Sequence, residues 1–302
     1  MRALVTGSVG FIGCHLCSRL AADGWEVLGA DIRAESRFRA GADRFLDERK
    51  AHSGVHHVAV DIRNLSALRR LASEHRPDVI FHLAAIASVH EAEREAQLCY
   101  DTNIGGTENV LRAASHVGAR VVFASSSAVY GNRAGLPHPI GVYGRSKYEA
   151  ERLCAASEEV SWVLRPFTVF GKYAREDMAA WRFATQIHNG HIVKLRKGAA
   201  RDMIDVRDVV RAFALAGQSV QQAPSGLADI GTGICTDMGD FAAMIAKALK
   251  LTLRVELERL PSFEVASTKA DLGRRDELSW APEITIGKSV QDFTEWYKQV
   301  VR

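Results

Sequence analysis

The sequence of 302 residues lacks several features that would assign it to a class at once. It contains no apolar run of membrane-spanning length, so we expect no membrane association. Its net charge of +3 is too small to indicate a nucleic-acid partner. It shows no internal repeat and no low-complexity linker, and no targeting segment precedes the first predicted strand at residue 2. We therefore expect a cytoplasmic globular protein.

Cysteine is also scarce, with five scattered residues. Cys14 and Cys17 stand close together, but they fall inside a predicted helix and no second pair completes a metal site. We interpret both as packing residues. The sequence therefore predicts no metal, and its cysteine usage is typical of a reduced, cytoplasmic protein.

The composition that is present, 47% hydrophobic and 25% charged, is ordinary for a globular protein with a substantial core. Strands and helices alternate through the first half, and the predicted strands are 2–6, 26–30, 55–60, 78–82, 120–124 and 162–165. Repeated strand–helix units predict an α/β fold, a Rossmann-type doubly wound parallel sheet covered by helices on both faces.

Three glycines, Gly7, Gly10 and Gly13, stand between the first strand and a predicted helix. Glycines at this turn let the backbone approach a pyrophosphate, which the positive end of the helix dipole attracts. Asp31 follows the second strand, where an acid holds the adenosine ribose hydroxyls. The pattern predicts bound NAD, because Asp31 repels the extra phosphate of NADP, although Arg33 nearby weakens that preference.

The second half is less regular and predicts a smaller, interleaved C-terminal substrate lobe. Its predicted helices are 178–188, 208–217, 237–249 and 288–300, its predicted strands are 191–195 and 251–257, and residues 166–171 read as a loop. We assign residues 1–165 plus about 201–225 to an NAD-binding Rossmann domain, and about 166–200 and 226–302 to the substrate-binding lobe.

Tyr143 and Lys147 are four residues apart on a helix predicted to end near residue 156, so they lie on one face. A Lys ammonium beside a phenol favours the phenolate and lowers the Tyr pKa from its ordinary value of about 10. Such a Tyr accepts a proton near neutral pH, and a Ser hydroxyl from residues 125–127 can bond the same substrate oxygen. The spacing is common by chance, and a Tyr packed on a Lys stem is the alternative.

Further polar residues stand at the ends of predicted strands, namely Asp61, His82 and Arg165. Ligands of parallel sheets collect at the carboxyl ends of the strands. We therefore expect these side chains to line one edge of the sheet together with the glycine turn and the serines.

Together these motifs resemble the extended branch of the short-chain dehydrogenase/reductase superfamily, the nucleotide-sugar epimerases and dehydratases. The matching stretches fall within residues 1–215 and are Thr6–Gly13, Asp31, Asp61, His82–Ala85, Asn103, Ser125–Gly131, Tyr143 with Lys147, Leu164–Pro166 and Arg201–Val206. The resemblance implies an NAD-dependent enzyme that works on a nucleotide sugar.

The resemblance also implies the roles of individual residues. The catalytic residues are then Ser126, Tyr143 and Lys147. Cofactor binding falls to Gly7, Gly10, Phe11, Ile12, Gly13, Asp31, Ile32, Arg33, Asp61, Ile62, Leu83, Ala84, Ala85, Asn103, Ala124, Ser125, Tyr143, Lys147, Pro166 and Thr168. Substrate binding falls to His90, Ser126, Ser127, Thr168, Arg175, Lys194 and Arg201.

The segment from residue 164 to 179 is similar to the corresponding part of UDP-glucuronate 4-epimerases. In that family a Thr and an Arg seven residues later bind the sugar carboxylate, and here those positions are Thr168 and Arg175. An Arg fork matches a carboxylate bidentately, and a neutral hydroxyl adds a third donor. The alternative is that Arg175 is a charge on a surface loop.

Other features bear on the chemistry. Family members that dehydrate or decarboxylate carry an acid after the active-site Ser or Thr, whereas Ala128 follows Ser127 here, which disfavours both reactions. His90 stands where the glucuronate epimerases have an Arg, and it can equally be a surface helix residue. The loop between residues 131 and 143 is short, and Phe170-Gly-Lys172 replaces the usual Tyr-Gly-Pro. These departures leave the identity of the substrate sugar undecided.

The leading hypothesis is therefore an NAD-dependent epimerase that inverts C4 of a nucleotide sugar, UDP-glucuronate to UDP-galacturonate, through a transient 4-keto intermediate. One alternative is a 4-ketoreductase or an epimerase acting on another nucleotide-activated sugar. A non-catalytic NAD-binding protein is the third, and the presence of Ser126, Tyr143 and Lys147 together argues against it. The family further implies a homodimer through helices near 103–117 and 143–156.

Overall fold

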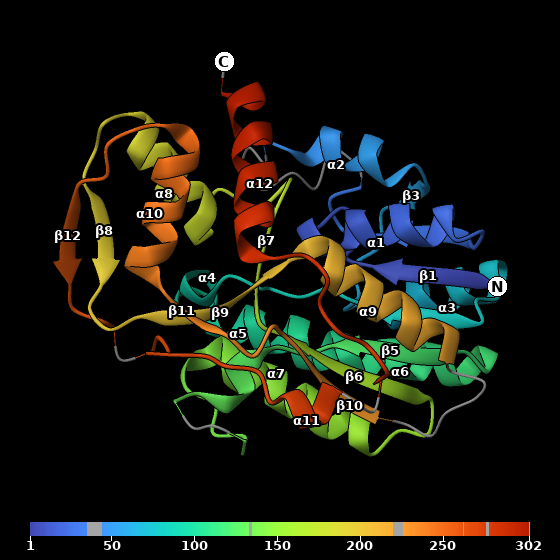
Figure 1. The fold of residues 1–302 in the computed structure, drawn as a ribbon. Coiled ribbons are helices and arrows are strands. Elements are labelled where there is room, and N and C mark those ends of the chain that lie inside the picture. The colour runs from blue at the N-terminus through green and yellow to red at the C-terminus, as the bar shows by residue number, and fades with distance from the viewer. Residues whose placement is uncertain (35–43, 133–134, 220–225, 262, 276–277, 302) are drawn as a thin grey trace.

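The structure, a computed structural model, describes residues 1–34, 44–132, 135–219, 226–261, 263–275 and 278–301. Within them, seven parallel strands form one sheet in the order β10-β6-β5-β4-β1-β2-β3 (Figure 1). They are β1 Arg2–Thr6, β2 Glu26–Ala30, β3 His56–Val58, β4 Val79–His82, β5 Arg120–Ala124, β6 Val160–Pro166 and β10 Gly226–Ile230. The predicted Rossmann-type, doubly wound parallel sheet is confirmed, and its strand order reverses between β1 and β4, where such sheets bind ligands.

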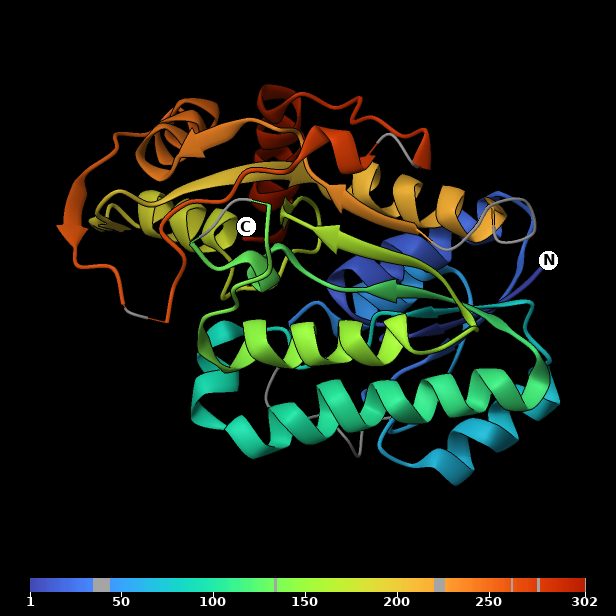
Figure 2. The same ribbon diagram turned by 90° about the horizontal axis from the view of Figure 1, so that it is seen from below.

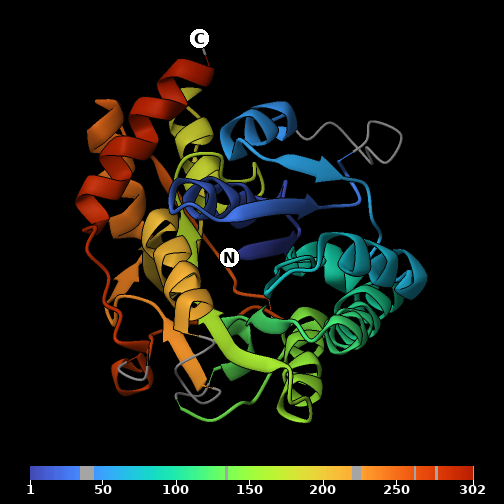
Figure 3. The same ribbon diagram turned by 90° about the vertical axis from the view of Figure 1, so that its right-hand side faces the viewer.

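Helices cover both faces of this sheet (Figure 3). One face carries α1 Phe11–Ala22 and α9 Val206–Ser219, with α2 Leu46–Ser53 beside α1, and the other carries α3 Leu65–His75, α6 Gly106–Val117 and α7 Gly141–Ala155. Successive side chains of a strand point to opposite faces, so Ala3 and Val5 pack with α1 and α9 while Leu4 packs with α3 and α6. The central strands β1, β4, β5 and β6 are thus buried on both faces, which explains their near-continuous apolar runs.

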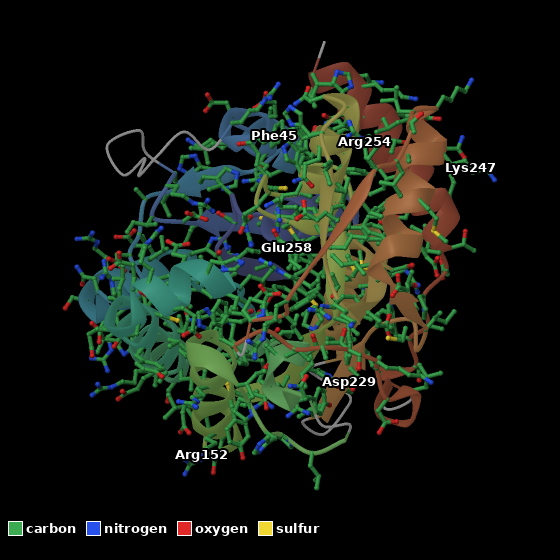
Figure 4. The ribbon with its side chains drawn as sticks, turned by 90° about the vertical axis from the view of Figure 1, so that its left-hand side faces the viewer. Phe45, Arg152, Asp229, Lys247, Arg254 and Glu258 are labelled. Carbon is green, nitrogen blue, oxygen red and sulfur yellow. The ribbon has the colours of Figure 1, made fainter. Side chains whose placement is uncertain are left out.

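The smaller lobe packs around a separate aromatic core. Its elements are β7 Thr168–Phe170, β8 Val193–Arg196, β9 Ala200–Asp205, β11 Cys235–Asp237, β12 Val255–Glu258, α8 Ala179–His188, α10 Met238–Leu249 and α12 Ile286–Val300. The strands form two small sheets, β11-β9-β7 and β12-β8. Trp181 and Trp296 lie in this core and contact Phe45, which precedes α2, with ring centroids 5.0 and 5.1 Å away (Figure 4). The first domain therefore contributes a residue to the core of the lobe.

The chain crosses between the two cores more often than the sequence indicates. Residues 226–230, assigned from the sequence to the lobe, form β10 and pair with β6 in the large sheet, so the second boundary lies after residue 230. Helix α9 packs on α1, as its predicted return to the first domain requires. A short helix, α11 Leu272–Arg275, packs against β10.

Local details differ from expectation in two places. Residues 168–170, predicted as loop, form β7 because β9, about 35 residues later in sequence, supplies a parallel partner that no local pattern reveals. The helix predicted across residues 102–117 begins with a π-helical turn at Asp101–Gly105 before α6 continues it. Two short helices, α4 Val89–Arg94 and α5 Ala96–Tyr100, lead into that turn. Asn64 is the N-cap of α3, since its side chain accepts from Ala67 N at 3.0 Å.

A buried ion pair joins α7 to the sheet beneath it. Arg165 on β6 donates from Nε and Nη2 to the carboxylate of Glu151 on α7, at 2.8 and 2.5 Å. The Ser125 hydroxyl, just after β5, donates to the same carboxylate. Arg165 also donates to the Tyr130 hydroxyl at 2.7 Å, and Tyr130 donates to Asp229 of β10 at 2.6 Å. One network therefore fixes the helix and the ends of three strands relative to one another, and α7 with α6 lies along the outer face (Figure 2).

Removing one side of this ion pair is expected to destabilise the fold strongly. Glu151→Leu should lower the free energy of unfolding by about 3–5 kcal/mol, because it leaves the Arg165 guanidinium charged and unpaired in the core. The matched control is Glu149→Gln on the same helix, whose pair with Arg152 is exposed and should cost less than about 1 kcal/mol. Urea denaturation measures the free energy of unfolding of both variants. Equal losses of stability would contradict the view that the buried Glu151–Arg165 pair matters more than the exposed pair.

Candidate active site

The glycine turn brings β1 to the amino end of α1. Gly7 has φ of 73°, and a Cβ there would lie 2.7 Å from the backbone nitrogen of Ala84, so only glycine fits. A Cβ on Gly13 would lie 2.1 Å from the Gly7 carbonyl oxygen. Gly10 precedes α1 with no side chain capping the helix, so the first N–H groups of α1 point toward the turn without a side-chain acceptor. This end of the helix fits the pyrophosphate of a dinucleotide.

Asp31 lies at the end of β2, beside the same turn. Its carboxylate accepts from Val9 N at 3.3 Å and from Arg33 N at 2.9 Å, and Arg33 Nε approaches it to 3.3 Å. The acid is thus held by the backbone of the glycine turn, at the place where a dinucleotide presents its adenosine ribose. Asp31, Ile32 and Arg33 therefore stand together, and the residues present fit NAD.

The other residues predicted to bind the cofactor surround the ends of β3 and β4. Asp61 pairs with Arg63 at 2.6 Å, and Ile62 is buried against Gly106. Leu83, Ala84 and Ala85 follow β4, opposite the glycine turn. His82 is buried, and desolvation lowers its pKa to about 3. It is therefore neutral and bridges the hydroxyls of Thr6 and Thr107 at 2.8 and 3.0 Å.

Asn103 lies in the π-helical turn and is fully buried. Its amide accepts from Ile86 N at 2.8 Å and donates to Ile86 O at 3.1 Å and to the Ser146 hydroxyl at 2.9 Å. Ser146 precedes Lys147 on α7. The side chain therefore ties the loop after β4 to the helix that carries Tyr143 and Lys147.

Tyr143 and Lys147 stand one turn apart on α7, facing the end of β5. Lys147 is buried, and its Nζ donates to Ala124 O at 2.8 Å and lies 4.9 Å from the centre of the Phe123 ring. Ser126 follows β5 in extended backbone conformation, and its hydroxyl forms a hydrogen bond that lowers the pKa of Tyr143. The structure therefore brings Ser126, Tyr143 and Lys147 together, as the sequence predicts.

The prediction that Lys147 lowers the pKa of Tyr143 is wrong for the chain by itself. Burial raises the pKa of Tyr143, and the groups that oppose this are the Ser126 hydroxyl and the Arg175 guanidinium. Lys147 is directed at the β5 carbonyl, and burial lowers its own pKa to about 8. The physical reason is that both side chains lose water in the same place, and desolvation disfavours each charged form.

The residues near Ser126 have different partners in the fold. The Ser125 hydroxyl is committed to Glu151, so it faces the core network. Ser127 is buried at the start of a short 3₁₀ turn, Ser127–Tyr130. Pro166 ends β6 and pairs in register with Ile230 of β10. Of the three serines, Ser126 is the one whose hydroxyl lowers the pKa of Tyr143.

Thr168 and Arg175 lie where the chain passes from β6 of the large sheet into the lobe. Thr168 is half-buried at the start of β7, opposite Met203 of β9. Arg175 lies in the loop between β7 and α8, near enough to Tyr143 to lower its pKa. Its Nε and Nη2 donate to the carboxylate of Asp177 at 2.9 and 3.2 Å. The charge of Arg175 therefore acts on Tyr143, while its Nε and Nη2 edge is paired with an acid.

The remaining residues predicted to bind substrate each have a partner in the chain. Arg201 of β9 donates from Nη1 to the carbonyls of Ala200 and Ala266, at 2.9 and 2.8 Å, and burial lowers its pKa while the charge of Glu264 opposes this. The exposed His90 approaches the same Glu264 at 3.5 Å. Lys194 is exposed on β8 and lies 3.0 Å from Glu258, which Figure 4 labels on β12. The charge of Glu264 therefore acts on both Arg201 and His90, whereas Lys194 pairs with a different acid.

Sequence reasoning missed three acids near the site. Asp177 pairs with Arg175, Glu264 faces Arg201 and His90, and Glu93 of α4 accepts from Val142 N at 2.6 Å at the start of α7. The Arg-x-Asp spacing around Arg175 is a signal that could have indicated the first. The other two depend on contacts between distant segments and leave no local pattern.

Two features of the described ranges bear on alternative classes of protein. No helix in them is long and apolar enough to cross a membrane. In the same ranges, no cluster of three or more His, Cys, Asp or Glu residues is arranged to hold a metal ion.

The fold and this arrangement define a dinucleotide-binding enzyme with a Ser, Tyr and Lys reaction centre. Residues 3–231 match the model of the NAD dependent epimerase/dehydratase family. The chain is 26% identical to a probable UDP-glucuronate 4-epimerase of Rhizobium meliloti, over 100% of this chain and 98% of that protein. The chain belongs to the NAD dependent epimerase/dehydratase family, and its cofactor is NAD.

Solved structures of similar proteins agree with this assignment. A UDP-glucuronic acid 4-epimerase from Bacillus cereus, in complex with UDP-glucuronic acid and NAD, matches with a TM-score of 0.87 at 26% identity, covering 99% of this chain and 100% of that one. A UDP-glucose 4-epimerase from Thermotoga maritima, with UDP-glucose, matches with a TM-score of 0.87 at 26% identity over 100% of both chains. The predicted class, an NAD-dependent nucleotide-sugar 4-epimerase, is confirmed, whereas the sugar stays a prediction.

Substitution of the first glycine tests the cofactor site. Gly7→Ala should abolish retention of NAD, because the added Cβ meets the backbone at Ala84 and the backbone has a positive φ. Mass spectrometry of the denatured protein measures the bound NAD. Gly287→Ala, in α12 with open space around it, is the control and should keep the wild-type NAD content. Equal NAD in both variants would contradict the placement.

The buried Lys147 should make the protein's stability depend on pH. Burial lowers its pKa from 10.5 to about 8, so between these values the unfolded chain binds more protons and stability rises with pH. Lys147→Met should therefore stabilise the cofactor-free protein at pH 7 by about 1–3 kcal/mol while removing activity. Thermal denaturation from pH 7 to 10 measures this, and the advantage of the variant should shrink as pH rises. A constant difference would contradict it.

Proposed function

We propose that this protein inverts the configuration at C4 of UDP-glucuronate to give UDP-galacturonate. The observation that carries the proposal is the position of Arg175, which is near enough to the Tyr143 phenol to lower its pKa. A cation beside the proton acceptor suits a sugar that carries a carboxylate next to its reacting carbon. The similarity to UDP-glucuronate 4-epimerases from two bacteria supports the same substrate.

The chain supplies the proton transfer of this reaction. Tyr143 takes the proton of the 4-hydroxyl, and Ser126 donates a hydrogen bond to the same oxygen. NAD, held by the glycine turn and Asp31, would supply hydride transfer at C4, which allows the 4-keto sugar to be reduced on its opposite face. Lys147 holds its positive charge beneath the reaction centre, with Nζ on the Ala124 carbonyl. No redox equivalents are gained or lost overall, so added cofactor is not required.

A uronate adds a second demand on the site. Its 4-keto intermediate is a β-keto acid, which loses CO₂ when the breaking C–C bond aligns with the carbonyl π system. Thr168 and Arg175 restrain the carboxylate away from that alignment. Ala128, which follows Ser127, brings no acid for a second proton transfer, so epimerisation is favoured over loss of CO₂ or water.

The remaining substrate contacts follow from charge. Arg201 pairs with the diphosphate, and the β8 backbone near Lys194 contacts the base. His90 and Ser127 complete the set of substrate-binding residues. The first domain, residues 1–165 with α9 and β10, holds NAD, while the lobe, which includes β9, holds the sugar nucleotide. We further propose a homodimer through α6 and α7, which lie side by side on one outer face (Figure 2).

The purified protein should convert UDP-glucuronate to UDP-galacturonate without added cofactor, read by NMR. Tyr143→Phe should lower the rate at least about 100-fold, since the general base is lost. Arg175→Ala should lower kcat/KM for UDP-glucuronate by at least about tenfold, since a charge-assisted bidentate contact is lost. Arg152→Ala, on the exposed face of α7, is the control and should leave the rate unchanged.

Failure to convert UDP-glucuronate while NAD is retained would overturn this substrate. Conversion of UDP-glucose alone would then identify a neutral sugar as the substrate of the same C4 chemistry. Net consumption of NADH would instead identify a ketoreductase.

A further inference from the structure

The guanidinium assigned to the sugar carboxylate is occupied by an acid of the same loop. Arg175 uses Nε and one N–H of Nη2 to hold Asp177, at 2.9 and 3.2 Å. An Arg side chain carries five N–H donors in a rigid fork, so the outer edge formed by Nη1 and the second N–H of Nη2 is not engaged by this pair. The geometry therefore leaves Arg175 able to hold Asp177 from one side and a second anion from the other.

Asp177 is itself held from a second direction. Burial raises the pKa of Asp177, but hydrogen bonds from Arg175 and from the Ser88 hydroxyl outweigh this and lower the pKa below its ordinary value. Asp177 is therefore ionised at neutral pH. Ser88 is the residue that caps α4, where it also accepts from Glu91 N at 3.4 Å. Asp177 is thus held both by Arg175 in its own loop and by Ser88 in the segment after β4, so its position does not depend on Arg175 alone.

This arrangement sets the charge that the site presents to the sugar. The Arg175–Asp177 pair is neutral as a unit, so a sugar with a neutral group at C5 meets no unbalanced charge. A uronate carboxylate gains the outer edge of Arg175 but lies near the carboxylate of Asp177, which repels it. Asp177 therefore reduces the advantage that Arg175 gives to a charged sugar.

We propose that Asp177 is a specificity-determining residue, which narrows the preference of the site for uronate over neutral nucleotide sugars by balancing the charge of Arg175. The proposal rests on the function proposed above, because it concerns the same sugar position. Asp177 acts through Arg175 and through repulsion of the carboxylate, so it is a positioning residue with no part in the proton transfer. Its neighbour Glu176 carries the same charge but points to Arg44, at 3.9 Å.

The test compares binding of two nucleotide sugars, which separates specificity from turnover. NAD-loaded protein in the Tyr143→Phe background binds UDP-glucuronate or UDP-glucose without reacting, and calorimetry gives both Kd values. Asp177→Asn should raise the ratio of the UDP-glucose Kd to the UDP-glucuronate Kd by roughly fivefold, the size expected for a partly exposed charge pair. Asp177→Glu, which keeps the charge, and Glu176→Gln, which removes the neighbouring charge, should leave the ratio within about twofold of the parent.

An unchanged or lower ratio in Asp177→Asn would overturn the proposal, as would an equal rise in Glu176→Gln. Binding of neither nucleotide sugar by the parent would overturn it too, because the proposal assigns both to this site. Asp177→Ser replaces Asp177→Asn if the latter does not fold, with the same expected rise. Loss of UDP-glucuronate turnover in the protein that retains Tyr143 would contradict the proposed function instead, and the binding ratio would still report on Asp177.

Discussion

The buried ion pair between Glu151 and Arg165 is the constraint on which the reaction centre depends. Tyr143 and Lys147 belong to α7, while Ser126 follows β5, and nothing local fixes the distance between a helix and a strand end. The pair fixes it, because Glu151 lies one turn beyond Lys147 and holds both Arg165 of β6 and the Ser125 hydroxyl. A charged pair in the core tolerates little displacement, since partial separation leaves both charges without water and without each other.

Much of this fold follows from local patterns. The strand–helix alternation and the Asn64 cap identify the Rossmann domain, since each is decided within a few residues. The parts that could not be predicted depend on distant partners. Strand β7 exists because β9 pairs with it, and Tyr130 finds Asp229 across 99 residues of sequence. The boundary expected at residue 225 lies before β10 for the same reason, because the pairing of β10 with β6 joins distant segments and leaves no local sequence pattern.

The site shows the same division. Residue types and spacing are sufficient to find Ser126, Tyr143 and Lys147, but not what each charge faces. Arg175 pairs with Asp177, and Arg201 donates to the backbone carbonyls of Ala200 and Ala266, because a partly buried guanidinium needs polar partners within the chain. A substrate carboxylate on the outer edge of Arg175 would lie close to Asp177, so the affinity for a uronate is the attraction to Arg175 less the repulsion from Asp177.

The charge of Arg175 also affects the pKa of Tyr143. Burial raises the pKa of Tyr143, and the Arg175 charge is one of the two influences that lower it. A carboxylate bound to Arg175 cancels part of that charge, so the group that selects a uronate also weakens the activation of Tyr143. This weaker activation concerns the reaction centre that also contains Ser126 and Lys147. Burial lowers the pKa of Lys147 to about 8, so Lys147 stays protonated below about pH 8. Sugar selection and proton transfer are therefore coupled through one guanidinium, that of Arg175.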